Sequence, residues 1–252
     1  MKKMQMLQQI VALVLFSMVA SSVGQRYDYG TVKLVLQWPI AYCNVRGICC
    51  KSPVPHAFKI HGLWHFKGSE IRTNCIPCHP LRPHHLTKNL NTRLRQAWPS
   101  LNLNGKDFQF WSHEWEKHGS CHHVGDPANY FQTALNLYSR YADVLPIISG
   151  SLSDEHKGYT PQEIVGIITK VTQRIPELRC SIDKYGRNQL YEIVLCFYPD
   201  KKHNIKDCRK NKFSQCHPSN IMFPSAQSFY SHNGQEVDTV RNQPQKSKND
   251  EL

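Results

Sequence analysis

The sequence lacks a second long apolar run, an N-glycosylation motif and a glycine-rich phosphate-binding loop. Its one sustained apolar segment, from Ile10 to Ala20, follows two lysines and precedes small residues that end at Gly24. This order is typical of a secretory signal peptide, and the segment is too short to span a bilayer. We therefore expect residues 1–24 to be removed, and the mature chain to be soluble, exported and free of N-glycans.

Acidic residues are scarce, because 19 Asp and Glu stand against 31 Lys and Arg, which gives a formal net charge of +12. Removing residues 1–24 takes away two lysines and no acid, so the mature chain keeps a charge of +10. Such a charge attracts polyanions, for example nucleic acid, anionic polysaccharide or an acidic membrane surface. With 40% hydrophobic residues among 252, the chain is neither a peptide-sized scaffold nor a disordered polymer.

All ten cysteines follow residue 24, in a chain expected to pass through an oxidising compartment. An even number in that context indicates disulfides. The alternative is a zinc site, because Cys75 and Cys78 have the spacing of a tetrahedral metal centre and His79 follows them. No second Cys-x-x-Cys accompanies this pair, so we expect disulfides, with no metal and no other cofactor.

Local patterns predict both strands and helices. Runs of β-branched, aromatic or alternating residues predict strands at 32–38, 57–64 and 190–198. Helical periodicity and capping residues predict helices at 87–97, at 126–145 and from 160 to the proline at 176. Without a regular βαβ order or an internal repeat, the expected class is α+β. We expect one disulfide-rich domain over 25–224, with a central antiparallel sheet and flanking helices, and a flexible polar tail over 225–252.

The densest group of reactive side chains lies in residues 110–121, FWSHEWEKHGSC. In a helix, residues four apart share a face, so His113 would lie near Lys117 and Glu114 near His118. A solvated charged turn is the alternative. The two tryptophans and the final cysteine favour a segment that is anchored in the core.

A further histidine, His61, lies in the apolar segment 58–64, FKIHGLW, where on its own it would be interpreted as a core histidine. Metal-free cleavage of RNA needs one group to take the proton of the ribose 2′-hydroxyl and a second to protonate the leaving 5′-oxygen. Two histidines can do both, because their ordinary pKa is about 6.5. Lys117 could then stabilise the negative charge that builds up on the phosphorane.

Segments 58–64 and 110–121 resemble the two active-site segments of the ribonuclease T2 family, FTIHGLWP and WxHEWxKHGTC. Further matches are LQWP at 36–39, AWPSL at 97–101 and IMFP at 221–224. The resemblance implies an α+β fold. It also implies a secreted or vacuolar endoribonuclease that needs no metal and forms 2′,3′-cyclic phosphates.

The resemblance carries roles over to individual residues. It implies that His118 is the general base and His61 the general acid, while Glu114 and Lys117 stabilise the transition state. It also implies that His113 and Trp64 help to hold the phosphate and to position the acid, and that Gln37 contacts a base. The expected partner is therefore single-stranded RNA, and neither DNA nor a membrane.

The family pattern also implies disulfides. The implied pairs are Cys75–Cys121, Cys180–Cys216, Cys43–Cys49 and Cys196–Cys208, which leaves Cys50–Cys78. Three departures from the pattern concern the active-site segments, and one of them is Lys59 in place of threonine. His65 stands where the family has proline, and we expect it to face solvent, while Ser120 replaces threonine and keeps the hydroxyl.

Within the family the sequence resembles plant members. Its basic charge favours a self-incompatibility S-ribonuclease with a pollen-side protein partner, although the missing glycosylation motif is unusual for that type. The alternative is an S-like ribonuclease of phosphate recycling, senescence or defence. Two hypotheses of other kinds are a zinc-dependent nuclease and a catalytically decayed basic binding protein; the presence of both histidines argues against the second. We expect a monomer.

The chain ends in Asn249-Asp250-Glu251-Leu252, which resembles an endoplasmic-reticulum retention signal. Asn249 stands where the receptor normally meets a basic residue, so the charged contact is lost. We therefore expect secretion, with retention in the endoplasmic reticulum or vacuole as the alternative.

Overall fold

The computed structural model describes residues 30–75, 79–122, 126–154, 157–208 and 216–225. The expected signal peptide and all but one residue of the expected tail lie outside these ranges. In the described part of the chain, six strands form one sheet in the order β3-β2-β1-β5-β4, with β6 paired to β5. Every pairing is antiparallel, so the predicted α+β class with a central antiparallel sheet is confirmed.

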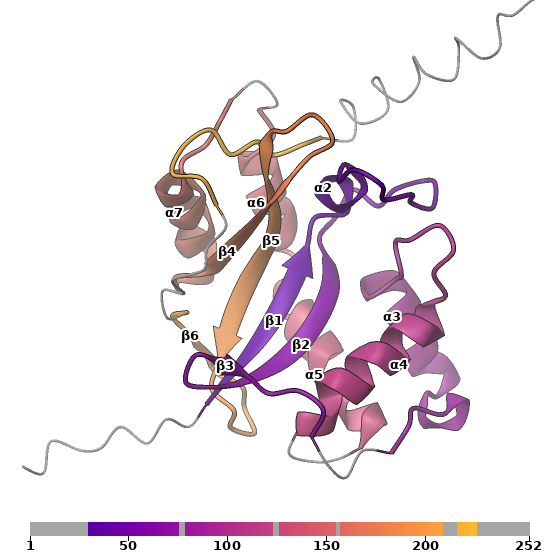
Figure 1. The fold of residues 1–252 in the computed structure, drawn as a ribbon. Coiled ribbons are helices and arrows are strands. Elements are labelled where there is room, and N and C mark those ends of the chain that lie inside the picture. The colour runs from indigo at the N-terminus through magenta and orange to yellow at the C-terminus, as the bar shows by residue number, and fades with distance from the viewer. Residues whose placement is uncertain (1–29, 76–78, 123–125, 155–156, 209–215, 226–252) are drawn as a thin grey trace, which may run out of the picture.

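The strands are β1 (Thr31–Gln37), β2 (Lys59–Lys67), β3 (Glu70–Ile71), β4 (Glu177–Ile182), β5 (Asn188–Phe197) and β6 (Ile205–Lys206). The helices are α2 (Pro39–Cys43), α3 (Lys88–Ala97), α4 (Asp107–Lys117), α5 (Pro127–Ser139), α6 (Leu145–Ser151) and α7 (Pro161–Thr172), with short 3-10 turns η1 (Pro83–His85) and η2 (Gly119–Cys121). In Figure 1 the face of the sheet turned toward the viewer is open, while α5 lies behind β1 and β2, and α3 and α4 lie beside β2. We call this side of the sheet the open face, because no helix covers it in this view, and α4 lies at its edge beside β2.

The central strand β1 is buried on both faces. Its residues Val32, Leu34 and Leu36 are fully buried in the main core, on the side covered by helices. Because successive side chains of a strand alternate between faces, Lys33 and Gln37 point to the open face. Polar side chains on a buried strand need partners, so this face is where a site is expected.

Capping residues set the helix ends much as the sequence predicts. Asp126 caps α5 by accepting from the Ala128 N–H at 3.0 Å, and Thr160 caps α7 within a capping box. The single helix expected over 126–145 is wrong, because α5 ends at Ser139 and α6 starts at Leu145. Pro146 has no N–H to donate to a preceding helical turn, so it fits the first turn of a new helix better than the interior of a continuous one.

Four disulfides join the described residues: Cys43–Cys50, Cys75–Cys121, Cys180–Cys216 and Cys196–Cys208. The last three confirm the expected pairs. The expected Cys43–Cys49 pair is wrong, because Cys50 bonds to Cys43 and Cys49 is a free, exposed thiol. Neighbouring side chains in an extended segment point to opposite sides, so only one of the two can face Cys43. The expected Cys50–Cys78 pair is wrong because the sulfur of Cys50 is bonded to Cys43. Cys78 itself lies outside the described residues.

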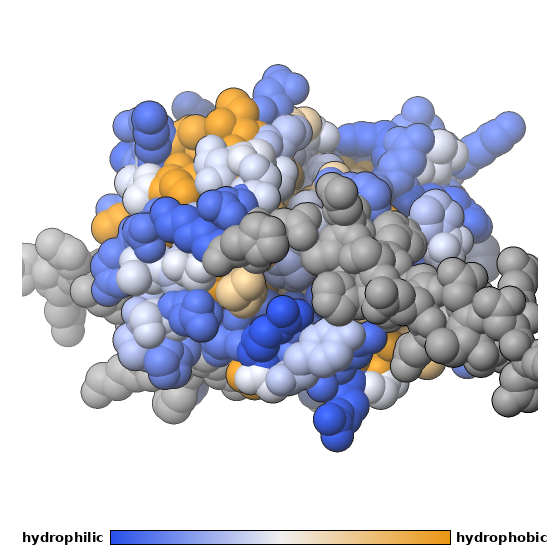
Figure 2. All heavy atoms as spheres, turned by 90° about the horizontal axis from the view of Figure 1, so that it is seen from above, coloured by the Kyte–Doolittle hydropathy of each residue, from blue (hydrophilic) through white to orange (hydrophobic). Residues whose placement is uncertain are grey.

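Hydrophilic residues predominate on the face seen in Figure 2, where apolar residues form only small groups. Small exposed apolar groups are normal for a folded domain. Within the described ranges, no helix combines the length and the apolar character that crossing a bilayer requires.

Candidate active site

His61 is the extra residue of a β-bulge in β2. The register between β1 and β2 pairs Val35 with Gly62 and then Leu36 with Ile60, which skips His61. A bulge bends the strand and re-aims the side chain of its extra residue. The indole of a buried tryptophan, Trp98, holds this bend by donating from Nε1 to the His61 carbonyl at 2.9 Å.

The re-aimed imidazole meets a buried carboxylate. Nδ1 of His61 lies 2.5 Å from Oε1 of Glu192, a β5 residue that is only 2% exposed. Burial alone disfavours the charged imidazole, but the hydrogen bond and the negative charge of Glu192, with a smaller contribution from Glu114, raise the pKa of His61 above its ordinary value. Since Nδ1 is bonded to Glu192, Nε2 is the nitrogen left to exchange a proton with a ligand.

The sequence interpretation missed Glu192. Its position follows from a second bulge, because β4 pairs Arg179 with Glu192 and then Cys180 with Leu190, which skips Tyr191. One signal was available: Glu192 is the single acid in the otherwise apolar buried run LYEIVLCF. An acid in such a strand needs a charged or hydrogen-bonding partner inside the fold.

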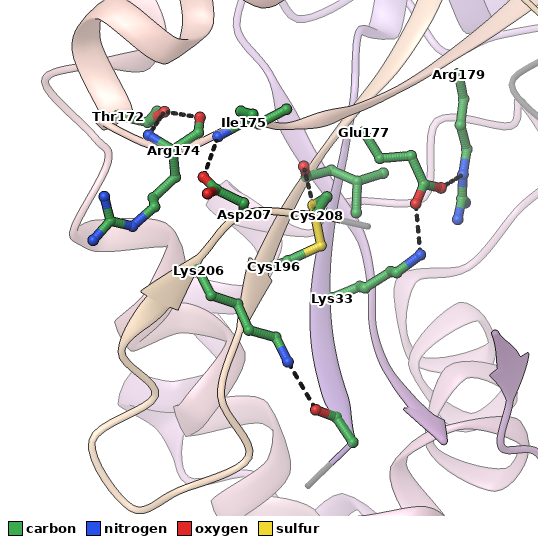
Figure 3. The surroundings of a disulfide bond; sticks show 12 residues. Lys33, Thr172, Arg174, Ile175, Glu177, Arg179, Cys196, Lys206, Asp207 and Cys208 are labelled. Carbon is green, nitrogen blue, oxygen red and sulfur yellow. Dashed lines mark hydrogen bonds and ion pairs between the residues drawn. A yellow bond between two sulfur atoms is a disulfide. The ribbon is translucent and has the colours of Figure 1, made fainter. Parts of the chain in front are cut away.

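A row of alternating charges holds Glu192 from the other side. Arg179 donates from Nη1 to Oε2 of Glu192 at 3.2 Å and from Nε to Oε1 of Glu177 at 3.1 Å. Glu177 in turn lies 2.5 Å from Nζ of Lys33, and Figure 3 shows this part of the row beside the Cys196–Cys208 disulfide. The four groups come from three neighbouring strands and fix the carboxylate that contacts His61.

Helix α4 brings a second carboxylate to the site. Its buried residues Trp111, Glu114 and Trp115 are three and four apart, so they lie on one face. The helix considered for 110–121 is confirmed as far as Lys117, and the 3-10 turn η2 follows it. Nε1 of Trp64 donates to Oε2 of Glu114 at 2.9 Å. Burial raises the pKa of Glu114, and the charges of His61 and nearby cations only partly oppose this effect.

His118 lies where α4 ends, and its N–H closes the helix by donating to the Glu114 carbonyl at 3.0 Å. Its side chain is buried beside Trp64, with ring centroids 5.0 Å apart. Burial, together with the positive charge of Lys117, lowers the pKa of His118 to about 4. The turn after His118 is tied to the core by the Cys75–Cys121 disulfide, and Ser120 Oγ accepts from the Cys75 N–H at 3.1 Å.

The structure brings most of the expected site residues together. His61, Trp64, Glu114 and His118 are in direct contact or share the Trp64 ring. The charges of His113 and Lys117, both exposed on α4, act on Glu114 and His118. Gln37 lies one strand away, where β1 pairs it with Glu192, and it is 3% exposed.

The expectation that His65 faces solvent is wrong. It follows Trp64 along β2, and since Trp64 points to the open face, His65 points to the face covered by helices. There it is 5% exposed, and its Nε2 lies 3.1 Å from Nδ1 of His122.

The zinc alternative for Cys75 is also wrong, because its sulfur is bonded to Cys121. Among the described residues, no three His, Cys, Asp or Glu side chains converge in a way that could hold a metal ion.

Comparisons with known proteins agree with this geometry. Residues 29–208 match the model of the ribonuclease T2 family. Ribonuclease 1 of Arabidopsis thaliana is 34% identical over 193 residues, which are 74% of this chain and 84% of that protein. Ribonuclease S-2 of Antirrhinum hispanicum is 33% identical over 193 residues, which are 74% of this chain and 79% of that protein.

A solved structure of RNase NT in complex with 5′-AMP matches with a TM-score of 0.68 at 30% identity, over 79% of this chain and 99% of that one. The fold, the site and these similarities define a ribonuclease of the plant type. The chain belongs to the ribonuclease T2 family, and its enzymatic class is endoribonuclease.

Proposed function

We propose that the protein cleaves single-stranded RNA by transesterification, without a metal ion, and forms 2′,3′-cyclic phosphate ends. One observation carries the proposal: His61 and His118 lie on the same tryptophan ring and have pKa values shifted in opposite directions. A pair of titratable groups whose environments separate their pKa values is suited to the roles of acid and base.

In this mechanism the neutral His118 removes the proton of the 2′-hydroxyl, and the 2′-oxygen forms a bond to phosphorus. The bond from phosphorus to the 5′-oxygen breaks, and the protonated His61 gives its Nε2 proton to that oxygen. The 5′-hydroxyl strand leaves, while the other strand keeps the cyclic phosphate. His118 carries the proton it took and His61 has lost one, so the charges balance.

Charge on the phosphorane is stabilised at the end of α4. Lys117 provides the cation. The raised pKa of Glu114 favours its protonated form, which can donate a hydrogen bond to a phosphoryl oxygen while Trp64 holds the other carboxyl oxygen. We further propose that His113 holds the phosphate, that Trp64 positions the acid, and that Gln37 contacts a base.

A cleavage assay on matched single-stranded RNA and DNA, in the presence of a chelator, tests this function. We expect RNA to be cut, DNA to be spared because it has no 2′-hydroxyl, and mass spectrometry to find 2′,3′-cyclic phosphate ends. Cleavage of DNA at a similar rate, or loss of RNA cleavage with the chelator, contradicts the proposal.

We propose that the enzyme is exported. The proposal is supported by the signal-like residues 1–24 and by four disulfides, which persist in oxidising compartments. Expression of the full chain beside a version without Asn249–Leu252 tests retention. Similar extracellular amounts of both support secretion, whereas a large rise after deletion shows that the tail retains the enzyme.

For the biological role, we propose the self-incompatibility type, supported by the formal charge of +12. The S-like role is the second candidate, because the chain is 34% identical to Ribonuclease 1 and 33% identical to Ribonuclease S-2, so sequence similarity does not decide between the two roles. The distribution of the protein among tissues separates the two. Accumulation confined to the style supports the first, and accumulation in senescing or phosphate-starved leaves supports the second.

A further inference from the structure

A cavity of about 390 Å³ lies on the helix-covered side of the sheet and shares no residue with the site described above. Its walls are β2 at His65, the residue after η2 at His122, one side of α5, and the loop 199–203. His65 follows Trp64 in the chain and His122 follows Cys121. The cavity therefore lies directly behind the two segments that form the active site.

The α5 wall is a polar stripe. Asn129, Thr133, Asn136 and Arg140 are spaced four, three and four apart, so they share one face of the helix and its last turn. The amide oxygen of Asn129 accepts from Thr133 Oγ1 at 3.2 Å, and that of Asn136 accepts from Gln132 Nε2 at 2.7 Å. Both oxygens are therefore used within the helix, and the amide N–H groups of these two lining residues are the donors that a ligand could use.

The charges at the cavity are mainly positive. Arg140 and Lys201 provide two cations, and Asp200 is the one acid among the described residues that line it. Arg140 donates from Nη1 to the carbonyls of Lys202 and His203, both at 3.0 Å, which fixes the guanidinium against the loop. His203 has a φ of 47°, a left-handed conformation that costs energy for a residue other than glycine. The bonds from Arg140 hold the loop in this conformation.

Three imidazoles also line the cavity, and its apolar wall comes from Val32, Leu137 and Pro199. His65 and His122 are buried and share a hydrogen bond, and the ring of His122 stacks on that of His203 with centroids 6.3 Å apart. Nitrogen lone pairs lie in the ring plane, so stacked rings do not direct them at one point, and this arrangement does not suit a metal ion. With Arg140 and Lys201 beside these rings, the cavity suits an anion instead.

We propose that this cavity binds a small phosphate-bearing anion. Arg140 and Lys201 supply positive charge, and the amides of Asn129 and Asn136 supply hydrogen-bond donors. The volume is sufficient for a nucleoside monophosphate as well as for inorganic phosphate. The proposal does not rest on the mechanism of RNA cleavage, and its test uses no cleavage readout.

The test is a titration of the mature protein, labelled at histidine with ¹³C and ¹⁵N and followed by NMR. The ligands are inorganic phosphate, a nucleoside 5′-monophosphate and the uncharged nucleoside. We expect the imidazole signals of His65, His122 and His203 to shift saturably with the first two ligands and to stay unchanged with the nucleoside. Tighter binding of the nucleotide identifies a nucleotide site, and equal binding identifies a phosphate site. Unmoved signals, or equal shifts with the nucleoside, overturn the proposal.

A matched pair of variants separates a built site from general attraction to a basic protein. Lys201→Ala removes a charge that lines the cavity, and Lys202→Ala removes the same charge from the next residue, whose side chain does not line it. We expect the first to weaken binding on the order of tenfold and the second to leave it unchanged. Asn136→Asp, which keeps an oxygen for Gln132 but adds a negative charge, is expected to abolish binding. Equal weakening in the two lysine variants overturns the proposal.

Discussion

The carboxylate of Glu192 accepts a 2.5 Å hydrogen bond from Nδ1 of His61, and Arg179 holds its second oxygen at 3.2 Å. This contact does two things at once. It fixes which nitrogen of His61 faces the substrate, and it raises the pKa of His61, so that the imidazole keeps its proton to a higher pH than an ordinary histidine does. Glu192 is therefore expected to be a positioning residue for the proposed general acid.

Glu192→Gln tests this role. The amide keeps the shape but not the charge, so the pKa of His61 falls, and the limb of the pH–rate profile in which activity is lost as pH rises moves to lower pH. Near neutral pH we expect kcat to fall on the order of 10², within the contribution of a general acid. Glu116→Gln, the same change at an exposed residue of α4, is the control and should leave the profile in place. A lower rate with an unmoved limb contradicts a role in setting the pKa.

The wild-type enzyme is expected to have a bell-shaped dependence of kcat/KM on pH. His118 must be neutral to act as base, so activity rises as pH increases through its pKa of about 4. His61 must be protonated to act as acid, so activity falls as pH increases through a value above the ordinary 6.5. Steady-state rates on a dinucleotide substrate from pH 3 to 9 measure both limbs. A basic limb below 6.5 would contradict the assignment of the acid.

The sequence predicted the residues whose roles depend on local spacing. His61 and His118 lie in contiguous motifs, and the tryptophans of 110–121 indicated a segment that is anchored in the core, which Trp111 and Trp115 of α4 are. Glu192 was missed because its role depends on a bulge that shifts β5 against β4, which no local pattern encodes. His65 was misplaced because a polar residue in a polar stretch gives no sign of which face of the strand it occupies.

Cysteine pairing shows the same limit. Cys75–Cys121 and Cys180–Cys216 were carried over correctly from the family pattern. Between the adjacent Cys49 and Cys50, the choice depends on the orientation of the backbone, which the spacing does not reveal.

His61→Ala and His118→Ala are each expected to reduce kcat on the order of 10²–10⁴, as the loss of a general acid or base does. The double variant should lose much less than the product of the two single losses, because acid and base act in one step. Single-turnover rates and circular dichroism of all three variants check the rates and the folding. Near-normal turnover by either folded single variant contradicts the role given to that histidine.

Cys49 is expected to be alkylated in the native, unreduced protein, because it is exposed and is in no disulfide. Peptide mapping after treatment with iodoacetamide should find the label on Cys49 and none on Cys43 or Cys50. Cys49→Ser should remove that label and leave the activity unchanged. A mapped disulfide between Cys43 and Cys49 contradicts the pairing in the structure.

Gly62 is expected to be intolerant of a side chain, since a Cβ there would overlap Nε1 of Trp64 and Oε2 of Glu114. Gly62→Ala should break the hydrogen bond between those two groups, lower kcat on the order of 10² and lower the free energy of unfolding by about 1–3 kcal/mol. Gly166→Ala is the control, because its Cβ meets nothing within 4 Å in α7. Alanine favours helix, so this variant should gain about 0.5–1 kcal/mol and keep full activity. Rates and urea unfolding of the two variants provide the comparison, and full activity of folded Gly62→Ala would show that the Trp64–Glu114 contact is not needed for cleavage.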